Sequence, residues 1–443
     1  MYELLSSIDG YVWGPPLLIL LVGTGIFLSS RLGLIQILKL PTALKLIFSD
    51  DANGDGDISS FAALATALAA TVGTGNIVGV ATAIKLGGPG ALFWMWVAAF
   101  FGMATKYAEG LLAIKYRVTD ENGEKAGGPM YYITNGLGQK WKWLAILFSI
   151  FGVMVALLGS GTFTQVNSIT DSLKNTVGIA PQVVSPVLAV LVAVIIFGGI
   201  QSISKVSEKL VPFMAGIYIL AAIVVIIFHA DNFIPSIILI FKSAFTGQAA
   251  LGGFAGAGFM LAIQSGVARG VFSNESGLGS APIAAAAART NEPVEQGLIS
   301  MTGTFIDTII ICTLTGLSII VTDGWSTDLN GAILTQFAFG QVFGNIGQIA
   351  LTVSLVLFAF TTILGWSYYG ERCFEFLFGS KSIIIYRILY VIMIAIGGYI
   401  SLETIWVLAD IVNGLMAFPN LIALLGLSPI IVSETKKYFA KQK

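Results

Sequence analysis

The sequence predicts an all-α membrane protein that crosses the bilayer about eleven times. Three observations predict this fold class: the apolar composition, the length of the apolar runs, and the distribution of lysine and arginine between them. Of 443 residues, 56% are hydrophobic and 11% are charged, and the mean hydropathy is +0.87. Soluble chains carry about a quarter charged residues. Soluble domains of this length could not bury so many apolar side chains, whereas a bilayer can cover them.

The apolar runs are long enough to span a membrane. A helix needs about 20 mostly apolar residues for this, because only hydrogen bonds within the protein satisfy the backbone in hydrocarbon. Eleven segments are candidates. They cover residues 14–37, 61–85, 91–114, 143–173, 185–200, 210–228, 252–288, 298–321, 346–370, 383–400 and 405–427.

The basic residues agree with eleven spans. If the N-terminus is outside, eighteen lysines and arginines fall on the inner loops and helix ends, and only Lys85, Lys174 and Lys242 fall on the outer face. Cytoplasmic loops are enriched in these residues, so the C-terminus is predicted to be cytoplasmic. The segment Met1–Asp9 lacks the basic flank of a cleaved signal peptide, and we expect the first apolar segment to remain in the mature protein.

Charge and cysteine content exclude several classes. The net charge is −1 and no basic block is present, so we expect no nucleic-acid partner. Cys312 and Cys373 fall in or beside apolar segments and are predicted to be free thiols rather than a disulfide. The single histidine, His229, rules out a histidine metal site. Asp51–Ser59 imitates the start of a calcium loop, but Ala62 stands where the bidentate glutamate is needed. A solvated turn with Ser59 or Ser60 capping a helix is the preferred interpretation.

Two of the apolar segments contain polar, glycine-rich interruptions. The second reads TVGTGNIVG from Thr71 to Gly79, and the seventh reads RGVFSNESGLGS from Arg269 to Ser280. Glycine is poor in helix interiors, and polar groups are costly at membrane depth. Such stretches occur where a helix is unwound around a cavity and its free backbone groups meet a ligand. The alternative for Gly75, Gly79 and Ala83 is close helix packing, since they are spaced four apart.

The two interruptions occupy equivalent places in the chain. Residues 59–228 and 245–427 each contain five segments, and an interrupted segment opens each set. Because five is odd, the second set crosses the membrane in the opposite sense, as in an inverted repeat with a substrate site between the broken helices. Residues 1–58 then form an extra N-terminal helix and cytoplasmic linker, and residues 428–443 form a cytoplasmic tail.

The motifs around the first interruption resemble those of the alanine or glycine:cation symporter family. The most specific match is GGPGALFWMWVAAFFG from Gly87 to Gly102, and TVGTGNIVG, KYAE at Lys106–Glu109 and SNESGLG at Ser273–Gly279 also match. The resemblance covers residues 58 to 427. It implies the ten-helix core of LeuT-type sodium symporters, with one extra helix in front. It also implies sodium-coupled transport of a small neutral amino acid, alanine or glycine.

The first break is expected to hold the substrate carboxylate. Backbone N–H groups around Thr74 and Gly75 open a half-helix, whose positive dipole end favours a carboxylate. Asn76 matches the asparagine that follows Gly-x-Gly in LeuT-type chains, where the side chain helps a second cation site. Gln165, Phe272 and Trp366 are candidates to wall the substrate pocket, with ordinary packing as the alternative for each.

The sodium site is implied by the same resemblance. By resemblance to LeuT-type symporters, the hydroxyls of Thr361 and Thr362 would bind the ion. The backbone carbonyls of Ala69, Val72 and Phe358 would complete the site. Thr362 would also border the substrate. The alternative is that each hydroxyl only bonds a carbonyl of its own helix.

Two further sets of charged residues lie within the predicted spans. Asp307 is expected to be a direct ligand or to join a network with Arg269 or a hydroxyl, and we favour the network. Lys106 and Glu109, one turn apart, are expected to form an ion pair rather than a gate.

The function expected from these features is sodium-coupled amino-acid symport by alternating access in a prokaryotic cell membrane. The partners are an amino acid, a co-transported sodium ion and the lipid bilayer, with no organic cofactor and no obligate protein partner. Proton coupling, a channel and a sensor remain alternatives. An enzyme would need paired catalytic groups facing one cavity, and none emerge from the sequence.

Overall fold

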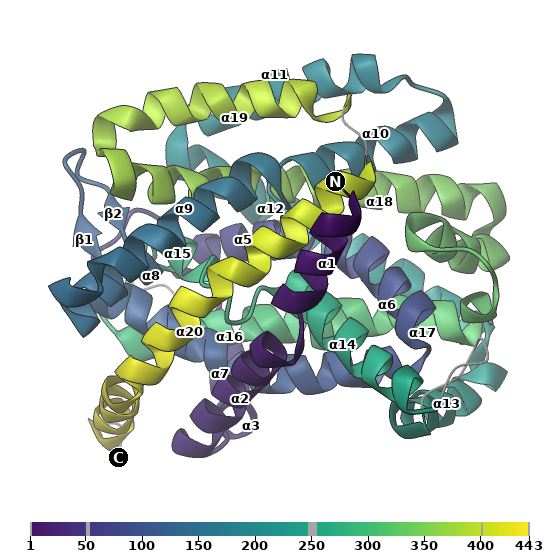
Figure 1. The fold of residues 1–443 in the computed structure, drawn as a ribbon, viewed down its shortest axis with the longest axis horizontal. Helices are drawn as coiled ribbons and strands as arrows, with labels where there is room; N and C mark the ends of the chain where they lie inside the picture. Colours follow the sequence, from purple (N-terminus) through teal and green to yellow (C-terminus); the bar gives the residue numbers. More distant parts are fainter. Residues whose placement is uncertain (1, 50–53, 247–254, 400–401, 442–443) are drawn as a thin grey trace.

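The computed structural model describes residues 2–49, 54–246, 255–399 and 402–441, and nearly all of them are helical (Figure 1). The helices are α1 Tyr2–Val12, α2 Pro15–Arg31, α3 Ile35–Leu38, α4 Leu40–Leu46, α5 Ser60–Thr71, α6 Val80–Gly87, α7 Gly90–Tyr116, α8 Pro129–Tyr132, α9 Lys142–Leu158, α10 Phe163–Val177, α11 Pro181–Ile196, α12 Gly199–Phe228, α13 Phe233–Thr246, α14 Ala255–Asn274, α15 Ala281–Ala285, α16 Pro293–Thr304, α17 Thr313–Val321, α18 Gly331–Phe378, α19 Ile383–Gly397 and α20 Leu402–Lys441. One small hairpin pairs β1 Val118–Thr119 with β2 Lys125–Ala126.

The membrane-spanning character of these helices agrees with the sequence. Within the described residues, eight helical runs are long and apolar enough to cross a membrane, and the bent pair of α5 with Gly75–Gly87 makes a ninth. Each of the eleven predicted segments overlaps a helix or a pair of helices. The total of eleven and the inverted repeat stay predictions, because α11 and the pair α14–α15 do not pass this test of length and composition.

Glycines let the central helices approach closely. A Cβ on Gly297 of α16 would lie 2.7 Å from the carbonyl oxygen of Tyr107 on α7, and one on Gly110 of α7 would lie 2.4 Å from Ser300 Oγ. Close backbone approach of this kind supplies the dispersion contacts that hold helices together where no hydrophobic effect operates between them. The pair α7 and α16 therefore forms a tight central wall, against which the broken helices pack.

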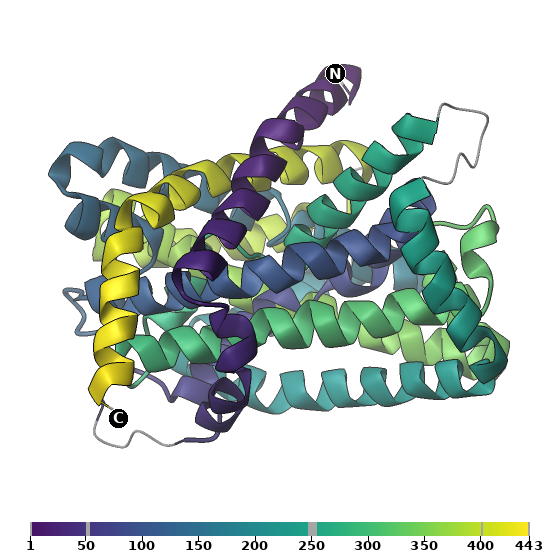
Figure 2. The same ribbon diagram turned by 90° about the horizontal axis from the view of Figure 1, so that it is seen from below.

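The periphery carries the extra N-terminal helices and the C-terminal helix. In Figure 1, α1 and α20 pack against each other on one face, and α11 and α19 lie together along one edge. Trp13 Nε1 donates to the carbonyl of Asp410 at 2.9 Å, which fastens the N-terminal segment to α20. Figure 2 shows the last turns of α20 at a steep angle to its first part, and Pro419 and Pro429, which cannot donate a helical hydrogen bond, lie within this helix.

Three irregularities interrupt the helices, two of them inside predicted spans and one just before the predicted span 346–370. The span 143–173 is interrupted between α9 and α10 at residues 159–162, and a Cβ on Gly161 would lie 2.9 Å from Trp366 Cβ. The span 298–321 contains a π-helix at Phe305–Cys312 that joins α16 to α17. The helix α18 kinks at Gly344, whose φ is 57°.

Ser59 Oγ accepts from Ala62 N at 3.0 Å, so the predicted cap of α5 is confirmed. Residues 51–53 of the calcium-like stretch lie outside the described residues.

Candidate functional site

The first break separates α5 from a π-helical turn, Gly75–Gly79, that leads into α6, and the two halves are bent by 51°. In a continuous helix the Gly73 amide would donate to the carbonyl of Ala69. Here the Gly73 N–H donates to the side-chain oxygen Oδ1 of Asn76 at 2.8 Å. The backbone N–H of Asn76 donates to Gly73 O at 3.2 Å rather than to Val72 O. The break therefore takes the regular helical donors away from the carbonyls of Ala69 and Val72.

The second break lies between α14 and α15. Glu275, Gly277 and Gly279 all have left-handed backbones, with φ of 57°, 87° and 82°. Glycine adopts this region without strain, but glutamate does so only when its surroundings impose it. The Glu275 carboxylate accepts from Trp366 Nε1 at 2.9 Å and from the hydroxyl of Ser280, so contacts on both sides hold the residue in place.

The two breaks meet in the interior of the protein. A Cβ on Gly75 would lie 3.0 Å from Ser273 Cα and 3.4 Å from Phe272 Cδ1, so α14 packs directly on the start of the second half-helix. Of the glycines spaced four apart, Gly75 makes this close approach, whereas a Cβ on Gly79 would meet nothing within 4 Å. Helix packing thus explains one glycine of that pattern and not the other.

Asp307 connects the two breaks through hydrogen bonds. Its Oδ1 accepts from Asn76 Nδ2 at 2.7 Å, and its Oδ2 accepts from Ser273 Oγ at 2.9 Å and from Thr308 Oγ1 at 2.7 Å. The preferred expectation, a network rather than a direct ligand, agrees with this geometry. Asn76 contributes its oxygen to Gly73 and its amide to Asp307, which sets the shape of the first break.

Arg269 pairs elsewhere. Its two terminal nitrogens reach the two oxygens of Asp410 on α20 at 3.1 and 2.7 Å. Arg269 therefore connects α14 to α20. The expected alternative in which Arg269 pairs with Asp307 is wrong. The hydroxyl partners of Asp307 take that role.

The predicted sodium residues lie together on α18 against the first break. The hydroxyls of Thr361 and Thr362 both donate to the carbonyl of Phe358 at 3.0 Å. Each hydroxyl thus bonds a carbonyl of its own helix, which was the alternative to a sodium site. These bonds still leave lone pairs on both hydroxyl oxygens that can accept a hydrogen bond or bind a cation. A Cβ on Gly73 would lie 2.4 Å from Thr362 Oγ1, so this oxygen borders the break.

Two predicted substrate residues carry buried polar atoms that lack partners. Thr74 and Gln165 are 0% and 2% exposed, and Thr74 Oγ1 and Gln165 Oε1 have no hydrogen-bond partner among the described residues. Gln165 Nε2 donates to Ser160 O at 2.9 Å, within the interruption between α9 and α10. A buried acceptor without a donor is costly, so these atoms are where a bound molecule would be stabilised.

The predicted wall residues are placed differently from one another. Phe272 is 8% exposed and touches the first break at Gly75. Trp366 is 1% exposed and is held by Glu275, with its ring edge-on to Tyr369. No direct hydrogen bond joins Gln165 to either break within the described part of the chain, and its link to Trp366 runs through the neighbouring segment at Gly161.

The expected ion pair between Lys106 and Glu109 is wrong. Glu109 Oε1 accepts from Gly277 N at 3.1 Å and from Asn420 Nδ2 at 2.6 Å, while Lys106 Nζ has no hydrogen-bond partner in the part of the chain that the structure describes. Glu109 instead binds the second break, because the left-handed turn there directs the Gly277 N–H toward its carboxylate. Spacing along one helix could not reveal this competition.

The start of α5 and the end of α15 are joined by hydrogen bonds between the loops that flank them. Ile58 and Ala288 form a parallel bridge, and Arg117 donates to the carbonyls of Asp55, Ala286, Ala288 and Thr290 at 2.6–2.9 Å. A side-chain hydrogen bond from Lys125 lowers the pKa of the Asp55 carboxyl. Sequence analysis gave no role to Arg117, because its partners are backbone carbonyls far along the chain.

Comparisons with known proteins show the family and the fold of this chain. The model of the sodium:alanine symporter family matches residues 1–443. The sodium/alanine symporter AgcS of Methanococcus maripaludis is 53% identical over 98% of this chain and 97% of its own. The probable sodium/glutamine symporter GlnT of Bacillus subtilis is 38% identical, over 100% of this chain and 92% of its own.

A solved structure shares the fold. The crystal structure of MhsT in complex with L-phenylalanine superposes with a TM-score of 0.56 at 13% identity, covering 86% of this chain and 98% of that one. This likeness shows the LeuT-type fold. The full-length family match and the identity to AgcS establish that the chain belongs to the sodium:alanine symporter family and is a sodium-coupled amino-acid symporter rather than an enzyme.

Proposed function

We propose that this protein carries a small neutral amino acid, alanine or glycine, into the cell together with sodium by alternating access. The proposed topology places the N-terminus outside and the C-terminus in the cytoplasm of a prokaryotic cell membrane. The observation that carries the proposal is the meeting of the two breaks around Asn76, Ser273 and Asp307 in the protein interior. Unwound backbone at membrane depth is tolerated where it lines a binding cavity.

The sodium ion is proposed to bind between the first break and α18. Hard cations such as sodium favour oxygen ligands, in line with the preference of other group 1 and 2 ions. The carbonyls of Ala69 and Val72 lack their regular helical donors, and Thr362 Oγ1 lies against Gly73. With Thr361 and the carbonyl of Phe358 these groups supply five oxygens without a buried carboxylate, which suits a monovalent ion that must also leave.

The substrate carboxylate is proposed to lie at the start of the second half-helix. Thr74 and Gly75 open this half-helix, so their N–H groups have no partner within it and face an anion with the positive end of the dipole. The buried Thr74 Oγ1 and Gln165 Oε1 are proposed to meet polar groups of the substrate. Asn76 positions this cradle through its bonds to Gly73 and Asp307.

The substrate is proposed to be small because bulky side chains surround the breaks. Phe272 contacts Gly75, and Trp366 is fixed by its bond to Glu275, so neither can move aside without losing a contact. AgcS, whose name gives alanine, is 53% identical, whereas GlnT, whose name gives glutamine, is 38% identical and YrbD of Bacillus subtilis, whose name also gives alanine, is 37% identical. The higher identity to AgcS favours alanine over a longer amide side chain.

Transport into liposomes tests the proposal. The purified protein is reconstituted, and uptake of labelled alanine is measured with an inward sodium gradient and with equal sodium on both sides. We expect concentrative uptake only with the gradient, competed by glycine and not by glutamine. Equal uptake driven by a proton gradient in the absence of sodium would favour proton coupling, and downhill flux that a gradient cannot concentrate would favour a channel.

A further inference from the structure

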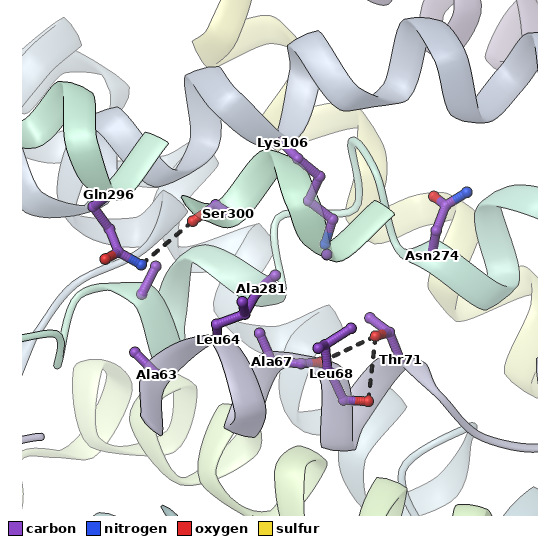
Figure 3. A pocket seen from close by; sticks show the side chains of 12 residues that line it. Ala63, Leu64, Ala67, Leu68, Thr71, Lys106, Asn274, Ala281, Gln296 and Ser300 are labelled. Carbon is purple, nitrogen blue, oxygen red and sulfur yellow. Dashed lines mark hydrogen bonds between the residues drawn. The ribbon is translucent and has the colours of Figure 1, made fainter. Parts of the chain in front are cut away.

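A small internal cavity lies on the inner side of both breaks, apart from the proposed substrate and sodium residues. Thr71, the last residue of α5, and Asn274, the last residue of α14, line one end of it. Gln296 and Ser300 of α16 line the other end, and Lys106 of α7 lies between the two ends, as Figure 3 shows. None of the residues proposed above to bind substrate or sodium lines this cavity. It therefore lies next to the site, on the side that the proposed topology turns to the cytoplasm.

Lys106 extends into this cavity without a partner. The side chain is 3% exposed, and its Nζ makes no hydrogen bond to any described residue. Burying an ammonium group is costly unless an anion or several acceptors compensate for the lost hydration. In Figure 3 its amino end points into the space between α5 and the chain at Asn274.

The nearby carboxylates make no hydrogen bond or ion pair with Lys106 among the described residues. Other donors bind Glu275, Asp307 and Glu109 Oε1, and Glu109 Oε2, like Lys106 Nζ, has no hydrogen-bond partner there. Glu109 accepts from Gly277 and Asn420, and Glu275 accepts from Trp366 and Ser280. The Asp307 carboxylate already accepts three hydrogen bonds, and it pairs with no lysine. Within the described residues Lys106 forms no ion pair. Its charge is therefore available to a mobile anionic group.

Gln296 supplies the complementary group. Its side chain is 1% exposed, its Oε1 has no donor among the described residues, and its Nε2 has only a long bond of 3.5 Å to Ser300 Oγ. The cavity thus presents one cationic donor and one amide acceptor, both buried and both unsatisfied. A halide would use the first and not the second, whereas an amino-acid zwitterion has a carboxylate for one and an ammonium for the other.

We propose that this cavity is an exit subsite, where Lys106 receives the carboxylate and Gln296 the ammonium of the amino acid as it leaves toward the cytoplasm. The inference rests on the proposed function and adds a second, weaker binding position to it. In the present conformation the volume is about 20 Å³, enough for little more than a water molecule. The subsite becomes available when the inner halves α5 and α15 separate from α7 and α16.

The test compares the two faces of the transporter in liposomes. Lys106→Met keeps the length of the side chain and removes its charge, and Lys106→Arg keeps the charge. Lys85→Met, at the opposite end of the first broken helix, is the matched control. For each protein, sodium-stimulated alanine binding is measured in detergent, and exchange is measured against a series of internal alanine concentrations. If the wild-type protein prefers another amino acid, that one is used throughout.

We expect Lys106→Met to bind alanine within about two-fold of wild type, while half-saturation of exchange by internal substrate rises about ten-fold. Lys106→Arg should restore most of this loss, Gln296→Leu should shift the same constant more weakly, and Lys85→Met should leave it unchanged. An unchanged internal constant in Lys106→Met would overturn the subsite. So would loss of equilibrium binding, which would place Lys106 in the primary site. A dependence on internal chloride at constant substrate would instead assign Lys106 to a halide. Absence of sodium-stimulated transport in the wild type would refute the proposed function by itself.

Discussion

Gly73 is a residue at which the first break packs against α18. Any side chain there would begin with a Cβ 2.4 Å from Thr362 Oγ1, so Thr362 would have to move away from the break. We expect Gly73→Ala to weaken sodium-stimulated alanine binding by about ten-fold or more, equivalent to about 1.4 kcal/mol. Scintillation proximity binding on the purified protein measures this loss. Gly79→Ala is the control, because its Cβ would meet nothing within 4 Å. Equal effects of the two substitutions would contradict the assigned contact.

Asp307 is expected to be a structural residue of the site. Asp307→Asn replaces an acceptor by a donor and leaves at least one of Asn76, Ser273 and Thr308 without its partner. We expect a loss of about 2–4 kcal/mol in stability, because hydrogen bonds to a buried charged group are strong and an orphaned donor adds its desolvation cost. Thermal unfolding monitored by tryptophan fluorescence measures the shift. Thr308→Val, which removes one donor to Asp307 and the acceptor of Asn274 Nδ2, should cost about 2 kcal/mol. A stable Asp307→Asn variant that lacks only binding would make Asp307 a direct ligand.

At this scale the sequence predicted the polar residues of the breaks better than their partners. Asn76, Asp307, Thr361 and Thr362 stand out because polar side chains are costly in apolar runs. Their partners are set by distance in space. Trp366 meets Glu275 across 91 positions and Arg269 meets Asp410 across 141, and no local pattern encodes such separations. Helical spacing alone predicts that Lys106 pairs with Glu109. In the structure Glu109 accepts a hydrogen bond from the backbone N–H of Gly277 in the second break.

Among the elements, the start of α5 and the end of α15 are joined by backbone hydrogen bonds and by one arginine. Arg117 donates to four carbonyls, two of them just beyond α15, and the bridge between Ile58 and Ala288 lies beside it. We expect Arg117→Met to favour inner opening, because the carbonyls lose their shared donor. Hydrogen exchange at Ile58 and Arg289, both bonded across this junction, should become about ten-fold faster. Arg289→Met, whose side chain makes none of these bonds, is the control. Unchanged exchange would show that the bridge alone closes the inner end.

The same junction should be insensitive to pH in the physiological range. Because the bond from Lys125 lowers the pKa of Asp55, this contact is present above the ordinary carboxyl pKa of 3.8 and is lost as the pH falls through the lowered value. Exchange protection at Ile58, corrected for the intrinsic rate, is therefore expected to stay constant between about pH 5 and pH 8. Lys125→Met should leave that plateau intact while raising the pH at which protection fails. A transition near neutral pH would implicate another titrating group.

Elements were predictable where composition alone defines them. Apolar length identified the spans, and glycine with polar residues identified both breaks. The interruption at residues 159–162, the π-helix at Phe305–Cys312 and the kink at Gly344 were not predicted. The first depends on the close approach of Gly161 to Trp366, and the second places Asp307 among donors from other helices. Such features follow from packing between segments and have no signature in a single apolar run.

For the whole molecule, the order of the apolar segments along the chain predicted the position of the binding site better than any single sequence motif did. Two interruptions that open two sets of five segments predicted a binding site between broken helices, and the contact of Gly75 with Ser273 agrees with this prediction. The LeuT-type fold is shown by the likeness to MhsT, whereas the inverted repeat and the topology of the termini stay predictions. Orientation in a membrane cannot be read from internal contacts, because it depends on a medium that lies outside the chain.

Coupling between sodium and substrate is a property of the molecule as a whole. In the proposed sites, the same break supplies carbonyls from Ala69 and Val72 for the ion and N–H groups from Thr74 and Gly75 for the carboxylate. An ion that fixes this break therefore prepares the carboxylate cradle, and the substrate prepares the ion site in return. Thermodynamic linkage requires both affinities to rise by one factor, about 5- to 150-fold for typical coupling.

Titration calorimetry of the purified protein measures both sides of this relation. The dissociation constant of alanine is determined without sodium and at saturating sodium, and that of sodium without alanine and at saturating alanine. We expect equal ratios in the wild type, and ratios near one in the double variant Thr361→Ala, Thr362→Ala, because α18 then offers only the Phe358 carbonyl to the ion. Ser354→Ala, which removes a hydroxyl bonded to Ala350 of the same helix at 2.9 Å, should keep the wild-type ratio. If the double variant kept the full ratio, the ion that drives transport would not need the two hydroxyls, and the proposed site between the first break and α18 would be wrong.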